Sequence, residues 1–120
     1  MEKTYLTLGK IDAYMIAYNL SNSVWKLVLQ WENFAKWTVG KQHTEAIDSI
    51  SANIAEGFGR YNKKGKIRFY RYSLGSMEES HDWTRKAAVR ELLTKEQIDY
   101  IIGELDKLPK AINQLIQYTN

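Results

Sequence analysis

The sequence SISANIAEGFGRYNKKGKIRFYRYSLGS, residues 49–76, decides the fold and carries the most distinctive charge pattern of the chain. It begins with isoleucines at helical spacing, passes Gly57 and Gly59, and continues into a second helical pattern. Between Arg60 and Arg71 it holds six cations and no acidic residue. The segment therefore predicts two packed helices whose connection forms a basic surface.

Outward from this segment, apolar residues recur at three- and four-residue spacing over most of the chain. The pattern predicts four helices, over about residues 11–31, 40–56, 62–93 and 95–118. Short connections between long amphipathic helices favour an all-α fold, an antiparallel up-down four-helix bundle. We expect residues 32–39 to form a longer aromatic-rich link over one end, and residues 5–8 to be extended.

Five residues mark the predicted ends and contacts of these helices. Gly57 is a plausible stop for the second helix, and Asn62 is a good capping residue for the third. Thr94 and Gln97 have the form of a capping box, which would open the fourth helix. We expect Gly75, in the third helix, to let another backbone approach closely.

Length and composition limit the class of protein. At 120 residues, with 44% hydrophobic and 26% charged residues, the chain is most simply one folded domain, residues 1–120. It has no cysteine, which excludes disulfides and thiolate chemistry. No apolar run approaches the roughly 18 residues of a membrane span, and the N-terminus lacks a signal-peptide hydrophobic region. We expect a cytoplasmic protein that does not contact the membrane.

The first predicted helix is apolar over an unusually wide arc. A second stripe lies beside the one that faces the core: Ile11, Tyr14, Tyr18, Trp25 and Leu29. The core of one small domain cannot cover both apolar stripes of this helix. We therefore expect the second stripe to be buried against another copy of the chain in a homo-oligomer. Its interface would include the aromatic residues Tyr14, Tyr18 and Trp25.

Polar residues on facing sides of the second and third helices suggest a structural contact. Asn53 and Glu56 lie on the flank of the isoleucine stripe, and Ser76 lies among apolar neighbours on the third helix. Glu56 could instead be a general base or a metal ligand, but no histidine or aspartate stands at ligand spacing. His43 and His81 fit packing roles. We expect no catalytic residue, no metal and no cofactor, and therefore no enzyme.

The basic corner consists of the cations in and after the second predicted connection: Arg60, Lys63, Lys64, Lys66, Arg68 and Arg71. Cations attract phosphate without regard to sequence, and interleaved exposed aromatics can stack on unpaired bases. A solvated basic surface without a ligand is the alternative. Net charge is only +3, so the placement of the cations is the signal, not their sum.

The chain resembles the four-helix-bundle proteins encoded in intervening sequences of bacterial large-subunit ribosomal RNA genes. The resemblance rests on GKQ at 40–42, DSISANIAEGFGRY at 48–61, KIRFY at 66–70 and GSMEE at 75–79. It implies a bacterial protein that assembles as a homopentamer, and it adds Glu79 to Asn53, Glu56 and Ser76 as a structural polar cluster. Accessory proteins of diversity-generating retroelements have a similar architecture, which implies RNA and a reverse transcriptase as partners.

Two functions remain open from the sequence. The leading hypothesis is a non-enzymatic nucleic-acid-binding protein that contacts structured RNA, more than DNA, through the basic corner and with little sequence preference. The alternative is a protein-interaction adaptor that docks a partner such as a reverse transcriptase. Family members often carry cations at the positions of Glu45 and Leu74, which weakens an RNA-binding role for those faces.

Overall fold

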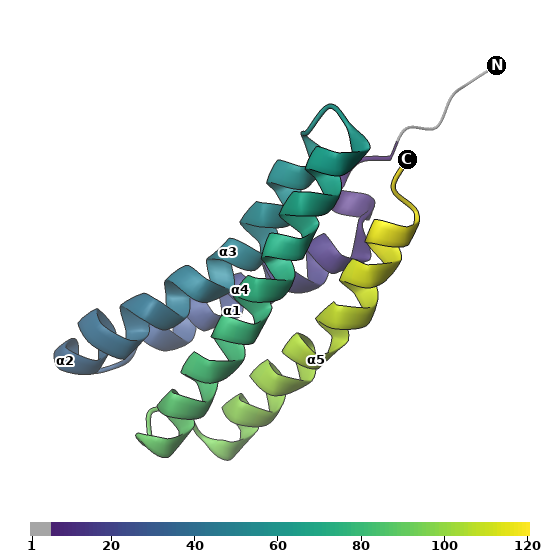
Figure 1. The fold of residues 1–120 in the computed structure, drawn as a ribbon. Coiled ribbons are helices and arrows are strands. Elements are labelled where there is room, and N and C mark those ends of the chain that lie inside the picture. The colour runs from purple at the N-terminus through teal and green to yellow at the C-terminus, as the bar shows by residue number, and fades with distance from the viewer. Residues whose placement is uncertain (1–5) are drawn as a thin grey trace.

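The computed structural model describes residues 6–120, and every regular element in that range is helical. Figure 1 shows the arrangement of the long helices and the short α2. The elements are η1 (Leu8–Lys10), α1 (Asp12–Leu29), α2 (Asn33–Ala35), η2 (Lys36–Gly40), α3 (Lys41–Phe58), α4 (Lys63–Val89) and α5 (Lys95–Gln117). Tyr5, predicted to be extended, lies outside the described residues, and Leu8 opens a short 3₁₀ helix.

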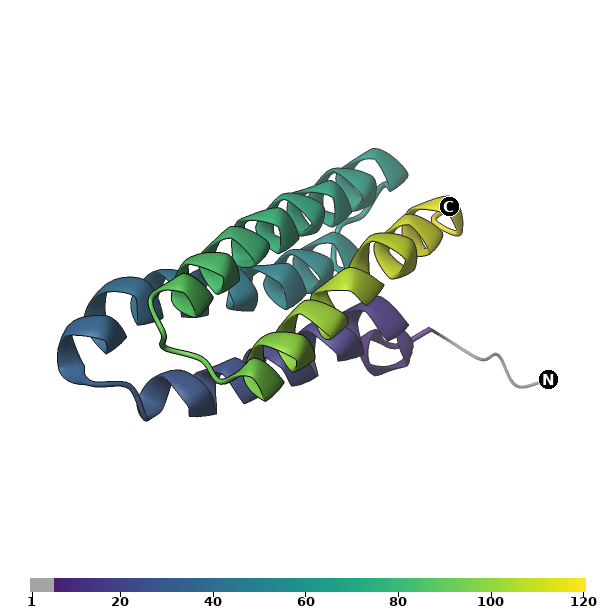
Figure 2. The same ribbon diagram turned by 90° about the horizontal axis from the view of Figure 1, so that it is seen from below.

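The four long helices surround one elongated core. Helix α3 packs against α1 and α4, and α5 packs against α1 and α4, so each long helix has two neighbours. The core side chains that are fully buried include Leu20, Ile47, Ile50, Ile54, Ile101, Leu105, Leu108 and Ile112. Figures 1 and 2 show the α3–α4 connection near the C-terminus, at the end of the bundle opposite α2. The periodicity of the apolar residues thus predicts the core correctly.

The predicted link at residues 32–39 is mostly helical. The Glu32 carboxylate accepts hydrogen bonds from the backbone amides of Phe34 and Ala35, at 3.1 and 2.8 Å, and so caps α2. The chain continues through the π-helix η2 directly into α3. Gly40, at the junction, has no room for a side chain, because a Cβ there would lie 2.7 Å from a Val28 methyl. The helical segment therefore begins well before residue 40, the predicted start.

Helix α4 ends at Val89, four residues before its predicted end. Glu91 adopts a left-handed conformation with φ 60°. Its amide donates to the Ala88 carbonyl at 3.1 Å, and the Leu92 amide donates to the Ala87 carbonyl at 2.9 Å. This pair of bonds is the Schellman motif, which terminates a helix and satisfies its last carbonyls. Glycine is the usual residue at this left-handed position, so a glutamate there gives no indication in the sequence that the helix ends.

Gly57 does not stop the second predicted helix, since α3 continues to Phe58. Its function is steric instead. A Cβ at Gly57 would lie 2.7 Å from Tyr70 Cε1 and 2.9 Å from the Lys66 carbonyl oxygen, so the glycine lets α4 approach α3 closely. At Gly75, where we expected such an approach, a Cβ would meet no atom within 4 Å. The close contact thus lies at the start of α4.

Candidate nucleic-acid interface

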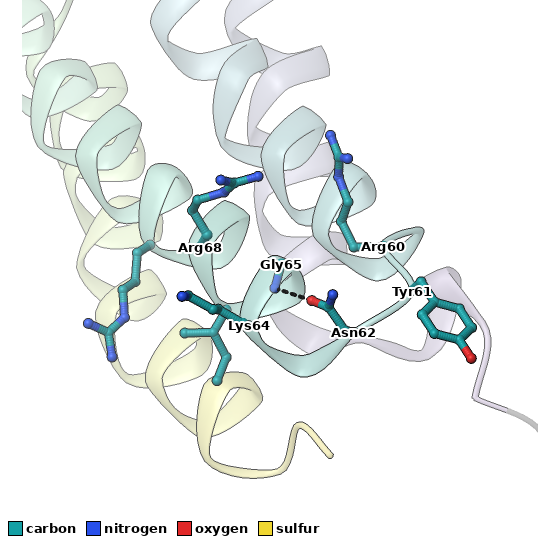
Figure 3. Close-up of a pocket in the computed structure, with 8 residues that line it drawn as sticks. Arg60, Tyr61, Asn62, Lys64, Gly65 and Arg68 are labelled. Atoms are coloured by element: carbon teal, nitrogen blue, oxygen red, sulfur yellow. Dashed lines mark hydrogen bonds between the residues drawn. The ribbon is translucent and has the colours of Figure 1, made fainter.

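The connection between α3 and α4 is held by polar caps at both ends. Asn62 is the N-cap of α4, and its Oδ1 accepts a hydrogen bond from the Gly65 amide at 2.8 Å, as Figure 3 shows. The Lys66 ammonium donates to the Phe58 carbonyl at the end of α3, at 2.7 Å. These bonds fix the direction of the first turns of α4 relative to α3. The capping role predicted for Asn62 is therefore present in the structure.

Two of the six cations of the basic corner already interact with other groups of the protein. Lys66 is half-buried and lies 5.5 Å from the centre of the Phe58 ring, in addition to its bond to the carbonyl. The Arg60 guanidinium pairs with the Glu56 carboxylate at 2.6 Å and lies 4.4 Å from the centre of the Phe69 ring. Both side chains help to hold the α3–α4 connection in place, and less of their charge is free for a ligand.

The other four cations are open to solvent. Lys63, Lys64, Arg68 and Arg71 are exposed and form no ion pair with any residue in the range 6–120. The Arg68 guanidinium also lies 5.4 Å from the centre of the Phe69 ring, a contact that leaves its charge unneutralised. Three of them, Lys64, Arg68 and Arg71, lie on one face of α4, because residues four and seven apart share a face. The first turn of α4 contains no acidic residue, so the positive end of the helix dipole adds to their field.

A shallow hollow, here called the basic hollow, is formed at this corner of the molecule. Figure 3 shows Lys64 and Arg68 on α4, with Arg60 and Tyr61 across the connection. The residues that line it are Arg60, Tyr61, Asn62, Lys64, Gly65, Ile67, Arg68 and Arg71. The Tyr61 ring is fully exposed, at 100% of its accessible surface. The hollow combines cations that can meet phosphates with an aromatic ring that can stack on a base.

The structure brings together only part of the predicted polar cluster. Asn53 Nδ2 donates to the Ser49 carbonyl at 2.9 Å and lies 3.4 Å from Ser76 Oγ, across the α3–α4 contact. Glu79 lines a hollow that also contains Asn53 and Ser76. Glu56 does not join them, because its carboxylate faces Arg60.

The predicted interface aromatics lie on α1, where they are partly or largely exposed. Tyr14 and Tyr18 stack with ring centres 5.7 Å apart, and Tyr18 and Trp25 are exposed at 45% and 54%. Trp25 borders an apolar groove that Trp37 of η2 also lines. Trp37 and the nearby Phe34 are even more exposed, at 71% and 76%. Both belong to the aromatic-rich link that the sequence predicts at residues 32–39 over one end of the bundle, but the prediction did not assign them to an interface.

The two histidines pack within the chain. His43 is fully buried, stacks on Trp31, and lies with its Nε2 2.8 Å from Thr84 Oγ1. That hydroxyl already donates to the Ser80 carbonyl, so Nε2 must carry the proton. His43 Nδ1 has no partner among residues 6–120, and burial lowers the pKa of His43 to about 4. His81 lies 3.1 Å from Asp106.

Metal-ligating clusters and membrane-spanning helices are both absent from residues 6–120. No group of three or more histidine, cysteine or acidic side chains in this range is arranged to hold a metal ion. No helix in the same part of the chain is both long and apolar enough to cross a lipid bilayer.

The geometry defines the class of the chain as a small all-helical bundle protein with an exposed basic corner. The chain belongs to the 23S rRNA-intervening sequence protein family, whose model matches residues 9–114. This match confirms the resemblance found in the sequence. No curated protein matches the chain.

A solved structure shares the fold. It is the crystal structure of a protein with unknown function from the S23 ribosomal protein family of Bacteroides thetaiotaomicron. The TM-score is 0.80 at 21% sequence identity, and the match covers 88% of this chain and 95% of that one. At this identity the likeness concerns the fold alone.

Proposed function

We propose that the protein is a non-enzymatic RNA-binding protein whose basic corner contacts the phosphates of a structured RNA. The observation that supports this most strongly is the row of exposed cations on α4, Lys64, Arg68 and Arg71, which no acidic side chain of residues 6–120 neutralises. Each cation that meets a phosphate releases a counterion, which supplies affinity without sequence preference. The membership of an rRNA-intervening sequence family is compatible with this role.

The proposal includes the assembly that the family resemblance implies. We propose an antiparallel up-down bundle that forms a homopentameric ring in a bacterial cytoplasm. The exposed apolar rings of Tyr18 and Trp25 on α1 support burial against a second copy. A ring would repeat the four open cations of each chain around its rim, and this would strengthen binding to an extended RNA.

The test is an RNA-binding titration on purified protein of known mass in solution. A pentamer of the 14.0 kDa chain would have a mass of about 70 kDa by light scattering. Binding should weaken about 50-fold between roughly 50 and 200 mM salt if four cations per chain meet the phosphates of single-stranded RNA. An absence of binding at the lower salt concentration would contradict the proposed function.

A second candidate function is favoured by a different surface. Phe34 and Trp37 are exposed at the end of the bundle opposite the basic corner, where they line hollows. Exposed aromatic residues are frequent anchors of protein interfaces. A protein adaptor, for example for a reverse transcriptase, would use this end. In that case Trp37→Ala would abolish association with the partner protein and leave RNA affinity unchanged.

A further inference from the structure

A second hollow lies directly beside the basic hollow, further along α4. It is lined by Asn53 of α3 and by Arg71, Tyr72, Gly75, Ser76 and Glu79 of α4. Arg71 lines both hollows. We call this second one the polar hollow. Because Lys64, Arg68, Arg71, Gly75 and Glu79 follow one another at three- and four-residue spacing, the two hollows share one face of the helix.

The floor and wall of the polar hollow are suited to a flat ring. Tyr72 is half exposed, and its ring and that of Phe69 form a T-shaped pair with ring centres 5.2 Å apart. Phe69 is in turn held by Arg60 and Arg68, whose guanidinium groups lie 4.4 and 5.4 Å from the centre of its ring, so the Tyr72 ring has a fixed support. Gly75 lies one turn further along, and a Cβ there would meet nothing within 4 Å. Part of the Tyr72 ring is therefore free to stack on a ligand, beside bare backbone.

The carboxamide of Asn53 is oriented by the protein. A backbone carbonyl can only accept a hydrogen bond, so the contact with the Ser49 carbonyl at 2.9 Å identifies the nitrogen of the carboxamide. The same nitrogen faces Ser76 Oγ at 3.4 Å. Both bonds use the donor side of Asn53, and its Oδ1 atom accepts no hydrogen bond from a residue in the range 6–120, so it can accept one from a ligand.

Glu79 supplies a second acceptor. Its side chain is exposed, lines the hollow and forms no ion pair within the described part of the chain. A carboxylate repels phosphate, so the backbone of a bound nucleic acid should stay on Arg71 and the cations before it. The Glu79 end of the polar hollow, beyond Arg71, therefore suits a group that carries no negative charge and presents hydrogen-bond donors.

We infer that the polar hollow binds one unpaired base of the RNA, stacked on Tyr72 and read by the acceptors of Glu79 and Asn53, with guanine preferred. This inference rests on the proposed function, since the phosphates next to that base would lie on Arg71 and Arg68. It adds recognition of one nucleotide to binding that is otherwise independent of sequence.

Guanine fits this site best among the four bases. Its Watson–Crick edge carries two adjacent donors, the N1–H and the N2 amino group, which match the two oxygens of one carboxylate. Adenine and cytosine each present one amino group there, and uracil presents a single N–H between two carbonyls that the acceptors would repel. A bidentate contact of this kind discriminates against a wrong base by roughly tenfold or more.

The test compares single-stranded oligouridylates that differ at one central position, which carries guanine, inosine or uracil. Inosine keeps the N1–H but lacks the amino group, so its affinity should fall between those of the other two. We expect the guanine oligonucleotide to bind about tenfold more tightly than the uracil one. The same guanine in a duplex should lose this advantage, because its Watson–Crick edge is paired.

The variant Glu79→Gln replaces one carboxylate oxygen by an amino group and should abolish the preference for guanine. Glu78→Gln is the matched control, because it makes the same change in charge at the adjacent exposed residue, which does not line the hollow. Tyr72→Ala should weaken binding of every single strand by roughly fivefold or more through lost stacking.

Two results would overturn the inference, and they differ in what else they overturn. If guanine and uracil oligonucleotides bind equally, the base site is refuted while the phosphate-binding proposal stands. If neither oligonucleotide binds at low salt but a structured RNA does, the base site is again refuted alone, and if no RNA binds, both proposals fail. Loss of the guanine preference in Glu78→Gln as well as in Glu79→Gln would also count against a role for the polar hollow.

Discussion

Reversal of charge at Lys64 and Arg68 tests the phosphate-binding proposal most quantitatively. Four cations of each chain are exposed and unpaired within residues 6–120, while Arg60 and Lys66 have partners in the protein. For a short single-stranded RNA that spans the basic corner of one chain and makes four phosphate contacts, the logarithm of the affinity should fall with the logarithm of salt concentration with a slope of about −2.8. A fourfold increase in salt would then weaken binding by about 50-fold.

The double variant Lys64→Glu/Arg68→Glu removes two of these contacts. The slope should become about −1.4, or shallower. The same fourfold increase in salt would then weaken binding only about sevenfold. The assay is fluorescence anisotropy of labelled RNA over a salt series. Lys26→Glu/Lys95→Glu is the control, since it makes the same change in net charge at exposed residues near the end of α1 and at the start of α5, away from the α3–α4 connection. Equal slopes for both variants, or an unchanged slope in the first, would refute the reasoning.

Three further predictions concern the stability of the bundle, each measured by urea unfolding. Gly57→Ala should destabilise the fold by about 1–3 kcal/mol, because its Cβ would overlap the Tyr70 ring, whereas Gly103→Ala, in open space on α5, should stabilise it by about 1 kcal/mol. Glu91→Gly should stabilise the fold by about 1 kcal/mol by relieving the left-handed conformation, and no gain would contradict that assignment. Burial lowers the pKa of His43 to about 4, so below about pH 6.5 the unfolded chain binds a proton that the folded protein excludes. The free energy of unfolding should therefore fall by about 3 kcal/mol as the pH drops from about 6.5 to about 4. His43→Gln should lose this dependence on pH, and an equally steep dependence in the variant would assign it to other groups.

The fold was largely readable from the sequence because apolar spacing carries it. The isoleucines of α3, and Leu105 and Leu108 of α5, occupy the buried positions that their periodicity predicts, and Leu115 is partly buried. The Thr94–Gln97 capping box is present in the structure as the sequence predicts. These features depend on residues close to one another along the chain, and local patterns are what a single sequence reveals.

The errors arose where tertiary contacts or backbone conformation decide the outcome. The π-helix η2 lies in a stretch without a clear amphipathic period, and Gly40 there is required by contact with α1. The end of α4 depends on a left-handed glutamate, which no composition rule predicts. Gly57 was mistaken for a helix stop because its partner, Tyr70, is adjacent only in three dimensions.

The sequence located the basic corner, but it did not show which of its cations are bound within the protein and which are open to solvent. The run of cations predicts a basic corner, and the structure separates Arg60 and Lys66, which bind partners in the protein, from the open Lys64, Arg68 and Arg71. That separation depends on which side chains reach a carbonyl or carboxylate. It also explains why fewer phosphate contacts are expected than the number of cations suggests.

The central claim, that RNA lies along the exposed face at the start of α4, is tested most directly by photo-crosslinking the wild-type protein to RNA and mapping the linked peptides by mass spectrometry. The account predicts crosslinks at Tyr61 and Tyr72, which border the basic and polar hollows. Crosslinks confined to Phe34 and Trp37, at the opposite end of the bundle, would contradict it.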